Sequence, residues 1–289
     1  PVTFRLAAGL VIEGRVVDPG GAPVRASVSA WPAVASSDTV TAQAQLSTAV
    51  DVAADGTFRL AGLTAGDHGL TVSPRAPWMP PSEPIVVASG RRDVVVTLAR
   101  GARVAGRVIG PDDEPVAGWL VATEGPPPHR RVRTDAGGAF DLDGASAPQG
   151  TVRISAHPDP ARAPDPRGYL RSAIVAAPAG ATDVRIRLAR GVFLEGTVVD
   201  AAGLAVPEGD VQSVLTWPDS TDRRGFESAR VDHEGRFRLG PVAPGPVGLF
   251  YKPAMARPRW AGSGEMSVVA PRADVIIVVH PTAVLIGRV

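Results

Sequence analysis

Short apolar segments with polar residues at alternating positions recur along the whole chain. In residues 183–188, Val184, Ile186 and Leu188 alternate with an aspartate and two arginines, and residues 10–17 show the same period. A period of two indicates β-strands with one buried face. No stretch carries a 3.6-residue apolar stripe, and 29 prolines and 32 glycines interrupt the chain too often for long helices. The pattern predicts an all-β protein built from short strands.

The phrase Gly-x-Val recurs at nearly even intervals. The copies that begin at residues 14, 106, 196 and 287 form a series in which neighbours are 90–92 residues apart. Three further features keep their order between these copies: a turn before a phenylalanine strand, a Gly-x-x-x-apolar segment, and an apolar run led by aspartate. The phenylalanines are Phe58, Phe140 and Phe237. A repeat of this kind decides the architecture, because each copy is one folding unit.

The repeats divide the chain into three complete modules with a fragment at each end. We predict β-sandwich module 1 over residues 10–100, module 2 over 101–190 and module 3 over 191–282. Residues 1–9 resemble the last strand of a preceding module, and residues 283–289 resemble the first strand of a following one. A module of about 90 residues is large enough to hold a sandwich core without metals or disulfides.

Each module is predicted to contain seven strands that form an antiparallel sandwich. In module 1 the expected strands cover residues 10–17, 24–31, 45–52, 57–61, 67–73, 84–88 and 93–99. Phe58 and its counterparts should lie at the centre of the cores. Hardly any residues separate the modules at 98–104 and 188–194. Because flexible linkers are rich in Gly, Ser or Pro, these junctions predict a semi-rigid rod.

Composition excludes several classes of protein and site. The chain has no cysteine, so it forms no disulfide and no thiolate zinc site. Its formal net charge of +1 gives no electrostatic basis for binding nucleic acid. No apolar run approaches the roughly 20 residues that a membrane span needs.

The sequence contains no recognisable catalytic or metal-binding motif. The histidines occupy different positions in the repeat and lack a His or Cys partner at metal-ligand spacing; they are His68, His129, His157, His233 and His280. No nucleophile elbow, phosphate loop or His-Glu-x-x-His motif is present. We therefore predict that the chain is not an enzyme and that it uses no cofactor.

Two acidic clusters and one arginine cluster allow more than one interpretation. The Asp-Asp-Glu turn at 112–114 and the pair Asp219 and Asp222 could bind calcium, but neither has the spacing of a calcium loop. Solvated turn residues are the simpler interpretation. The Arg-Arg-x-Arg segment at 130–133 could meet an anionic polymer or supply ordinary charges at strand edges.

Aromatic residues in loops are the most suggestive functional feature. Trp78, Tyr169 and Trp260 lie in the long loop expected between the fifth and sixth strands, and Trp31 and Trp217 end the second strands of modules 1 and 3. Loop aromatics form stacking platforms for sugars or for the apolar surface of a protein partner. The alternative is that each side chain folds down as a lid over one end of its sandwich.

The motifs of module 1 resemble a known domain family. Gly-x-Val-x-Asp at residues 14–18, Gly-x-Pro-Val at 21–24 and Asp-Gly-x-Phe at 55–58 are similar to those of the carboxypeptidase regulatory-like domain, also called transthyretin-like or prealbumin-like. Module 3 carries much of this pattern, and module 2 has Gly110 in place of the aspartate. The collagen-adhesin B-type repeat is a related fold. The resemblance implies three tandem seven-stranded Greek-key β-sandwiches, Ig-like or prealbumin-like, of an accessory or extracytoplasmic protein.

From these features we expect a non-catalytic structural and interaction array from a bacterial cell-surface or periplasmic protein. It would act as a semi-rigid spacer and as a protein-binding or adhesion segment, with a protein or a glycan as partner. Lys252 is the single lysine and asparagine is absent, so the Lys–Asn isopeptide cross-links of some adhesin repeats are excluded. The alternative is a carbohydrate-binding accessory region of a larger secreted hydrolase or peptidase, which would use the loop tryptophans.

Overall fold

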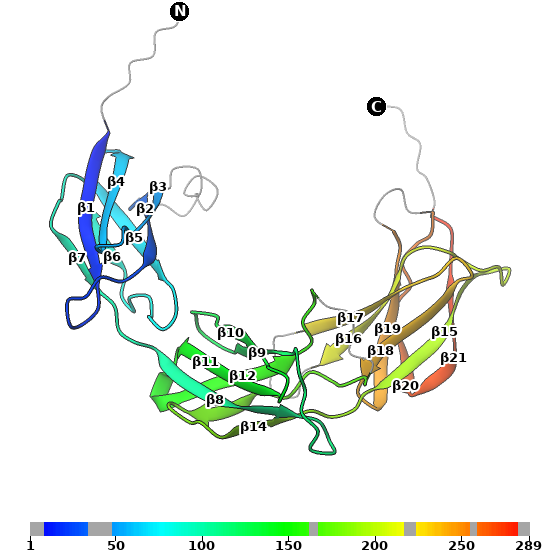
Figure 1. Cartoon of the computed structure of the whole chain (residues 1–289). Helices are drawn as coiled ribbons and strands as arrows, with labels where there is room; N and C mark the ends of the chain where they lie inside the picture. The colour runs from blue at the N-terminus through cyan, green and yellow to red at the C-terminus, as the bar shows by residue number, and fades with distance from the viewer. Residues whose placement is uncertain (1–8, 34–47, 162–166, 217–223, 255–258, 283–289) are drawn as a thin grey trace, which may run out of the picture.

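The computed structural model describes residues 9–33, 48–161, 167–216, 224–254 and 259–282. Its strands form three successive sets of seven, drawn in blue and cyan, in green, and in yellow to red (Figure 1). Each set folds into one three-stranded and one four-stranded sheet, and no described sheet contains strands from two sets. The only helical segment in these ranges is the 3₁₀ turn η1 (Pro148–Gly150). The predicted class of three tandem seven-stranded β-sandwiches is confirmed.

The strands of module 1 match the predicted segments to within three residues at each end. They are β1 (Leu10–Val17), β2 (Ala26–Pro32), β3 (Thr48–Asp51), β4 (Thr57–Leu63), β5 (Asp67–Pro74), β6 (Ile85–Ala88) and β7 (Val94–Thr97). Module 2 contains β8 (Ala102–Ile109), β9 (Leu120–Thr123), β10 (Arg131–Arg133), β11 (Ala139–Ala145), β12 (Thr151–His157), β13 (Val175–Pro178) and β14 (Val184–Arg187). Module 3 contains β15 (Val192–Asp200), β16 (Asp210–Thr216), β17 (Arg224–Arg230), β18 (Arg236–Val242), β19 (Gly245–Lys252), β20 (Met266–Ala270) and β21 (Arg272–Val279).

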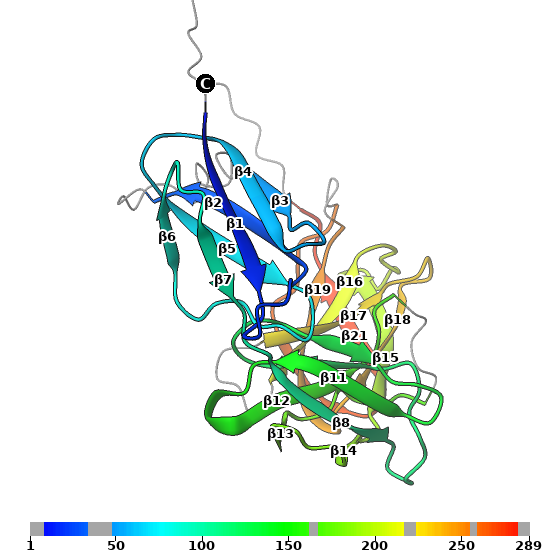
Figure 2. The same cartoon turned by 60° about the vertical axis from the view of Figure 1, so that its left-hand side comes forward.

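One sheet order recurs in all three modules. In module 1 the sheets are β4-β1-β7 and β3-β2-β5-β6, and the corresponding strands have the same order in modules 2 and 3. The first strand pairs antiparallel with the phenylalanine strand and parallel with the last strand of its module. Figure 2 shows this sheet of module 1 face-on, with β1 next to β7. The repeat in the sequence is therefore a repeat of topology.

In the three described Gly-x-Val phrases of the series, the glycine lies opposite the valine that follows the leading aspartate of the last strand segment. Gly14 is opposite Val94, and a Cβ placed on Gly14 would be 2.2 Å from the carbonyl oxygen of Val94. The corresponding distances for Gly106 and Gly196 are 1.9 Å and 2.1 Å. No side chain fits between the strands at these points, because non-bonded carbon contacts are about 3.5 Å or longer. The even spacing of the phrase thus reflects one steric requirement for each module.

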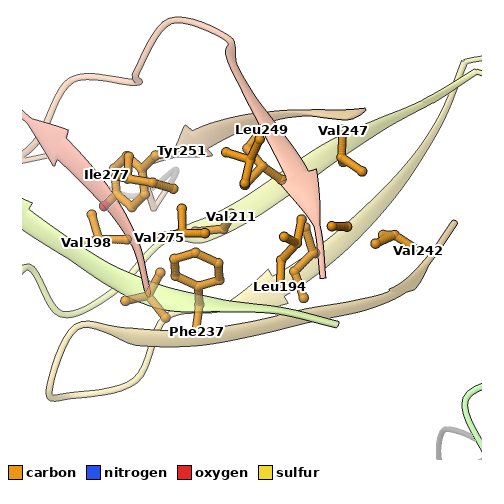
Figure 3. Packing of buried hydrophobic residues seen from close by; sticks show 14 of the residues in the cluster. Leu194, Val198, Val211, Phe237, Val242, Val247, Leu249, Tyr251, Val275 and Ile277 are labelled. Carbon is orange, nitrogen blue, oxygen red and sulfur yellow. The ribbon is translucent and has the colours of Figure 1, made fainter. Parts of the chain in front are cut away.

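Each module has its own apolar core between its two sheets. Phe58, Phe140 and Phe237 are each 4% exposed, as predicted for the central phenylalanines. Figure 3 shows the ring of Phe237 among aliphatic side chains of both sheets, including Val211 and Val275. With no cysteine in the chain, these cores supply the stability of the modules.

The two predicted end fragments cannot be compared with the structure. Residues 1–8 and 283–289 lie outside the described ranges. Within those ranges, no helix has the length and apolar character that a membrane crossing requires.

Candidate functional site at the module junctions

Each of the three aromatic loops pairs with the segment that follows the last strand of its module. In module 1, the amide of Met79 donates to the carbonyl of Ala99 (2.9 Å), and the amide of Gly101 donates to the carbonyl of Pro77 (2.8 Å). These bonds flank an isolated bridge between residues 78 and 100. The loop therefore holds the chain at the point where it leaves module 1.

The same arrangement, which we call the clamp, recurs in modules 2 and 3. Tyr169 bridges Arg190, and Trp260 bridges Pro281. The flanking amide-to-carbonyl bonds are Leu170 to Ala189 (2.9 Å), Gly191 to Gly168 (2.8 Å), Ala261 to His280 (2.8 Å) and Thr282 to Arg259 (2.9 Å). The aromatic residue is the middle of a short two-stranded clamp in all three modules.

The aromatic side chains of the clamps lie against the module cores. The Tyr169 ring is 2% exposed and meets Trp119 edge-on, with 6.2 Å between the ring centroids. Trp78 and Trp260 are half-buried and pack against the cores of modules 1 and 3. This is the lid arrangement, one of the two interpretations that the sequence leaves open. A ligand contact by these three residues stays a prediction.

Trp31 lies apart from the clamps, on the outer face of the four-stranded sheet of module 1. Its neighbour Ala30 points into the core, and Trp31 is opposite Gly69 on β5. A Cβ on Gly69 would be 2.7 Å from the indole ring, so the indole covers the backbone of β5. Trp217, the fifth aromatic predicted as a contact residue, lies outside the described ranges. For both tryptophans the contact role stays a prediction.

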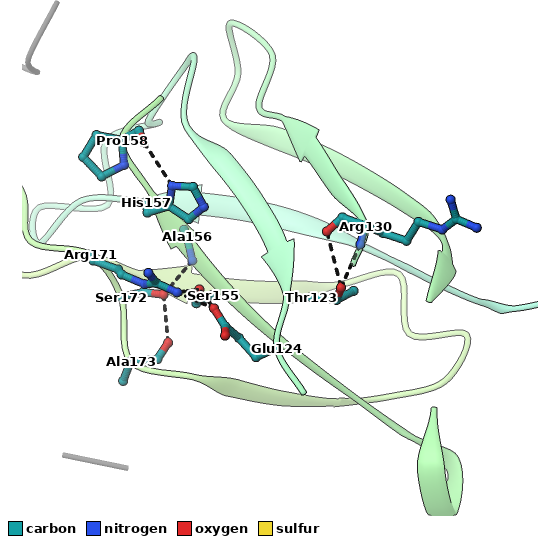
Figure 4. A network of polar contacts seen from close by, with 10 residues as sticks. All are labelled: Thr123, Glu124, Arg130, Ser155, Ala156, His157, Pro158, Arg171, Ser172 and Ala173. Atoms are coloured by element: carbon teal, nitrogen blue, oxygen red, sulfur yellow. Dashed lines mark hydrogen bonds and ion pairs between the residues drawn. The ribbon is translucent and has the colours of Figure 1, made fainter. Parts of the chain in front are cut away.

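An arginine of module 2 joins the first clamp to the second module. The guanidinium group of Arg130 donates to the carbonyl oxygens of Trp78 (2.7 Å) and Gly144 (3.1 Å), and burial lowers its pKa. Its backbone amide donates to Oγ1 of Thr123 (2.9 Å; Figure 4). Arg130 is thus neither a plain edge charge nor a free charge for a polymer. The sequence gives no sign of this role, because the acceptors are backbone carbonyls far along the chain.

Neighbouring modules also lie close together at glycines of both junctions. A Cβ on Gly144 of module 2 would be 3.1 Å from backbone atoms of Pro77 in module 1. A Cβ on Gly168 of module 2 would be 3.3 Å from the ring of Phe193 in module 3. Figure 1 shows that the chain of modules changes direction at both junctions. The predicted rod is therefore a bent array with direct contacts at each bend.

A polar network lies on the outer face of the four-stranded sheet of module 2 (Figure 4). Glu124 accepts hydrogen bonds from Oγ of Ser155 (2.6 Å) and from Arg171, whose guanidinium group also donates to Ser155 (3.0 Å). Nearby, Oγ of Ser172 accepts the amide of Ala156 (2.8 Å). A nucleophilic serine needs a base that is ready to take its proton. The carboxylate next to Ser155 is ion-paired with Arg171, so the three side chains link β12 to the segments that follow β9 and precede β13.

The acidic turn at residues 112–114 is fully engaged within module 2. Arg190 pairs with the first carboxylate (2.8 Å), Arg187 pairs with the second, and the hydroxyl of Tyr169 donates to the third. This last bond lowers the pKa of Glu114. Calcium needs six to eight oxygen ligands, and these carboxylates already have protein partners. The structure therefore favours the turn interpretation over the calcium interpretation.

The other candidate metal ligands do not form a site in the part of the chain that is described. No three His, Asp or Glu side chains there are placed to hold a metal ion. His68 is 2% exposed, with Nδ1 3.2 Å from the carbonyl oxygen of Gly66, as expected for a structural histidine. The second calcium candidate, Asp219 with Asp222, lies outside the described ranges.

A shallow groove recurs beside the phenylalanine strand of every module. Its volume is about 720, 470 and 790 Å³ in modules 1, 2 and 3. The wall residue that follows the phenylalanine is Arg59, Asp141 or Arg238, so its charge reverses in module 2. A common ligand would need a common lining. The groove is therefore a consequence of the fold and does not identify a shared binding site.

Comparison with known proteins gives only distant structural likenesses. No protein-family model matches the chain, and no curated protein shows a significant match. A streptococcal ancillary pilin is similar in structure at 10% identity, with 94% of this chain and 99% of that chain covered and a TM-score of 0.34. The shaft pilin SpaA from Lactobacillus rhamnosus GG has 13% identity, coverage of 64% and 99%, and a TM-score of 0.30.

The Bacillus anthracis TIE protein is similar at 13% identity, with 95% of this chain covered and a TM-score of 0.25. The chain spans about half the length of that protein, 51%. Likenesses at these identities and scores decide nothing about function. The resemblance to the carboxypeptidase regulatory-like family stays a prediction.

Proposed function

We propose that the chain is a non-catalytic spacer and interaction segment of a bacterial cell-surface or periplasmic protein, in which three sandwiches are held at restricted angles. The observation that carries the proposal is the clamp, which recurs at residues 78, 169 and 260. A chain held in this way does not swing freely about a linker, because the connecting residues are already hydrogen-bonded to their own module.

Arg130 contributes most to the first junction. Its two bonds reach carbonyl groups of module 1 and module 2, and it is partly buried. A hydrogen bond that involves a charged group contributes about 1.5–3 kcal/mol. The ion pair between Arg100 and Asp143 (3.1 Å) is more exposed, and such pairs contribute about 0–1 kcal/mol. Loss of Arg130 alone should therefore raise the ratio of open to closed arrangements of modules 1 and 2 about tenfold or more.

The polar chemistry of the described residues supports a non-catalytic role. The carboxylates of the acidic turn and of Glu124 are held by arginines or by hydroxyl donors. The cell-surface or periplasmic setting rests on the resemblance of the sequence motifs to extracytoplasmic modules. Protein binding is proposed together with the spacer role, and it is not assigned to the three clamp aromatics, because these pack against their own modules.

Small-angle X-ray scattering of the whole chain tests the spacer role. The wild-type chain should fit a narrow distribution of radii of gyration, and Arg130→Ala should broaden that distribution. Arg131→Ala is the matched control, because Arg131 is exposed on the neighbouring strand β10, and its scattering should overlay that of the wild type. Circular dichroism checks that all three chains are folded. Wide flexing of the wild type, or no change in Arg130→Ala, would contradict the proposal.

A further inference from the structure

A polar cavity lies on the outer face of the four-stranded sheet of module 1, where β2 begins and β5 ends. Its volume is about 360 Å³, a size that holds a small ligand. The charged side chains of its lining are Arg25, Arg75 and Asp51, and the hydroxyl side chains are Ser27 and Ser73. No residue of the clamps lines it.

Arg25 and Arg75 lie opposite each other across β2 and β5. Ala26 is paired with Pro74 in the register of these strands, and the amide of Arg75 donates to the carbonyl of Arg25 (3.5 Å). Both arginines are exposed, and Val24 and Ala26 on either side of Arg25 are buried, so Arg25 points away from the core. Like charges at opposite positions destabilise a sheet.

Neither guanidinium group has an acidic partner. Among the described residues, no hydrogen bond or ion pair involves the side chain of Arg25 or Arg75. Asp51 lines the same cavity without forming an ion pair with either of them. Four other arginines of module 1 do have carboxylate partners: Arg59, Arg91, Arg92 and Arg100. The cavity therefore holds two unneutralised positive charges side by side.

Module 2 has an ion pair across the corresponding positions. The strand registers place Asp159 of module 2 where module 1 has Arg75, and Arg133 where module 1 has Asp51. Arg133 and Asp159 are paired, and the side chain of Asp159 is 5% exposed. In module 1 the signs of the two charges are exchanged and no ion pair joins them. The space that a protein carboxylate fills in module 2 is thus left beside two arginines in module 1.

We propose that this cavity binds an oxyanion, namely a carboxylate, phosphate or sulfate group of a ligand, between Arg25 and Arg75. Guanidinium groups form paired N–H···O bonds to such groups. Ser27 and Ser73 are opposite each other next to the arginines and supply hydroxyl donors. A bound anion also removes the repulsion between the two arginines. The site does not depend on the proposed spacer function.

Titration of the whole chain with acetate, phosphate and sulfate tests the site. At constant ionic strength, the backbone amide signals of Ser27 and Ser73 in NMR spectra should shift and saturate with at least one of these anions, with a Kd on the order of 1–10 mM. Chloride should cause no saturable shift. The anion that binds most tightly shows whether the ligand presents a carboxylate, a phosphate or a sulfate. Absence of saturation with all three overturns the proposal.

Variants at the charged positions test the assignment to these side chains. Arg25→Gln combined with Arg75→Gln should weaken binding of the anion at least tenfold. Arg15→Gln is the matched control, because Arg15 is exposed and lies on β1 of the other sheet, and it should bind like the wild type. Asp51→Asn removes a negative charge from the cavity and should tighten binding several-fold. Unchanged binding by the double variant, equal loss in the control, or weaker binding by Asp51→Asn overturns the proposal.

Thermal unfolding of module 1 tests the repulsion between the arginines separately. In chloride at low ionic strength, Arg75→Gln should melt above the wild type, because the like charges no longer face each other. The anion that binds most tightly, at five times its Kd, should raise the melting temperature of the wild type by about 4–8 °C and leave that of Arg75→Gln nearly unchanged. An equal rise in both chains would overturn the proposal.

Discussion

Adding one methyl group at Gly196 should strongly destabilise module 3. The Cβ of an alanine would lie 2.1 Å from the carbonyl oxygen of Val275, and that oxygen belongs to the backbone of β21. Gly196 does not have a positive φ, so alanine can adopt its backbone conformation. The predicted effect therefore comes from lack of space alone.

The magnitude follows from the movement that would relieve the contact. The two strands must separate by about 1 Å to restore an ordinary carbon–oxygen distance. Overpacking of a well-packed interior costs about 1–3 kcal/mol, and each weakened ladder hydrogen bond adds about 1 kcal/mol. We expect a loss of about 2–4 kcal/mol, which for a unit of this size lowers the melting temperature by about 10–25 °C.

Differential scanning calorimetry of the whole chain measures this loss, because the other two modules provide internal references. Gly264→Ala is the matched control in module 3, since a Cβ there would have no heavy atom within 4 Å. Its transition should stay in place or rise slightly. If Gly196→Ala melts like Gly264→Ala, the steric explanation of the repeat is wrong. Gly14→Ala and Gly106→Ala should show the same loss in their own modules.

Three further predictions concern the core, an edge strand and the acidic turn. Phe58→Ala should lower stability by about 3–5 kcal/mol, and a thermal melt without loss would contradict its place in the core. Burial raises the pKa of Glu227, so its carboxylate destabilises the fold as pH rises above the unfolded pKa. Glu227→Gln should therefore raise the melting temperature near neutral pH but not below about pH 4, whereas the exposed control Glu83→Gln should have no effect at either pH. The hydrogen bond from Tyr169 lowers the pKa of Glu114, so its stabilisation is lost as pH falls through the folded pKa; in urea unfolding, Tyr169→Phe should cost more near neutral pH than in acid, and equal losses would exclude this linkage.

The strands and their threefold repetition can be predicted from the sequence because both depend on short-range rules. Alternation of apolar and polar residues places β1 and β14 directly. The Gly-x-Val spacing is reliable for a physical reason, because Gly14 and its counterparts each meet a backbone carbonyl that leaves no room for a side chain. Because this requirement for glycine occurs at the same place in each module, the glycines recur at intervals equal to the module length.

The contacts of the junctions cannot be predicted in this way. Arg130 binds the carbonyl of Trp78, which is 52 residues away in the sequence, and any residue type can offer a carbonyl. Glu124 and Arg171 are 47 residues apart, and many other acidic and basic residues would have been equally plausible partners. The sequence places the aromatics in loops, but the choice between lid and platform depends on burial, which the sequence does not specify.

An irregularity in the pairing of β8 with β11 lies next to the junction between modules 1 and 2. β8 and β11 shift register between Leu142 and Ala145, and Gly144 in between has a φ of +78°, a conformation that glycine adopts at least cost. The bulge lets Gly101 approach so closely that a Cβ on it would be 2.6 Å from the Cα of Gly144. It also presents the Gly144 carbonyl to Arg130.

A larger residue at position 144 should therefore weaken both the pairing of β8 with β11 and the contact between modules 1 and 2, whereas Arg130→Ala should weaken only the contact between the modules. The junction between modules 1 and 2 thus depends on a strand irregularity, which brings the Gly144 carbonyl to Arg130 and the Gly144 backbone close to Pro77.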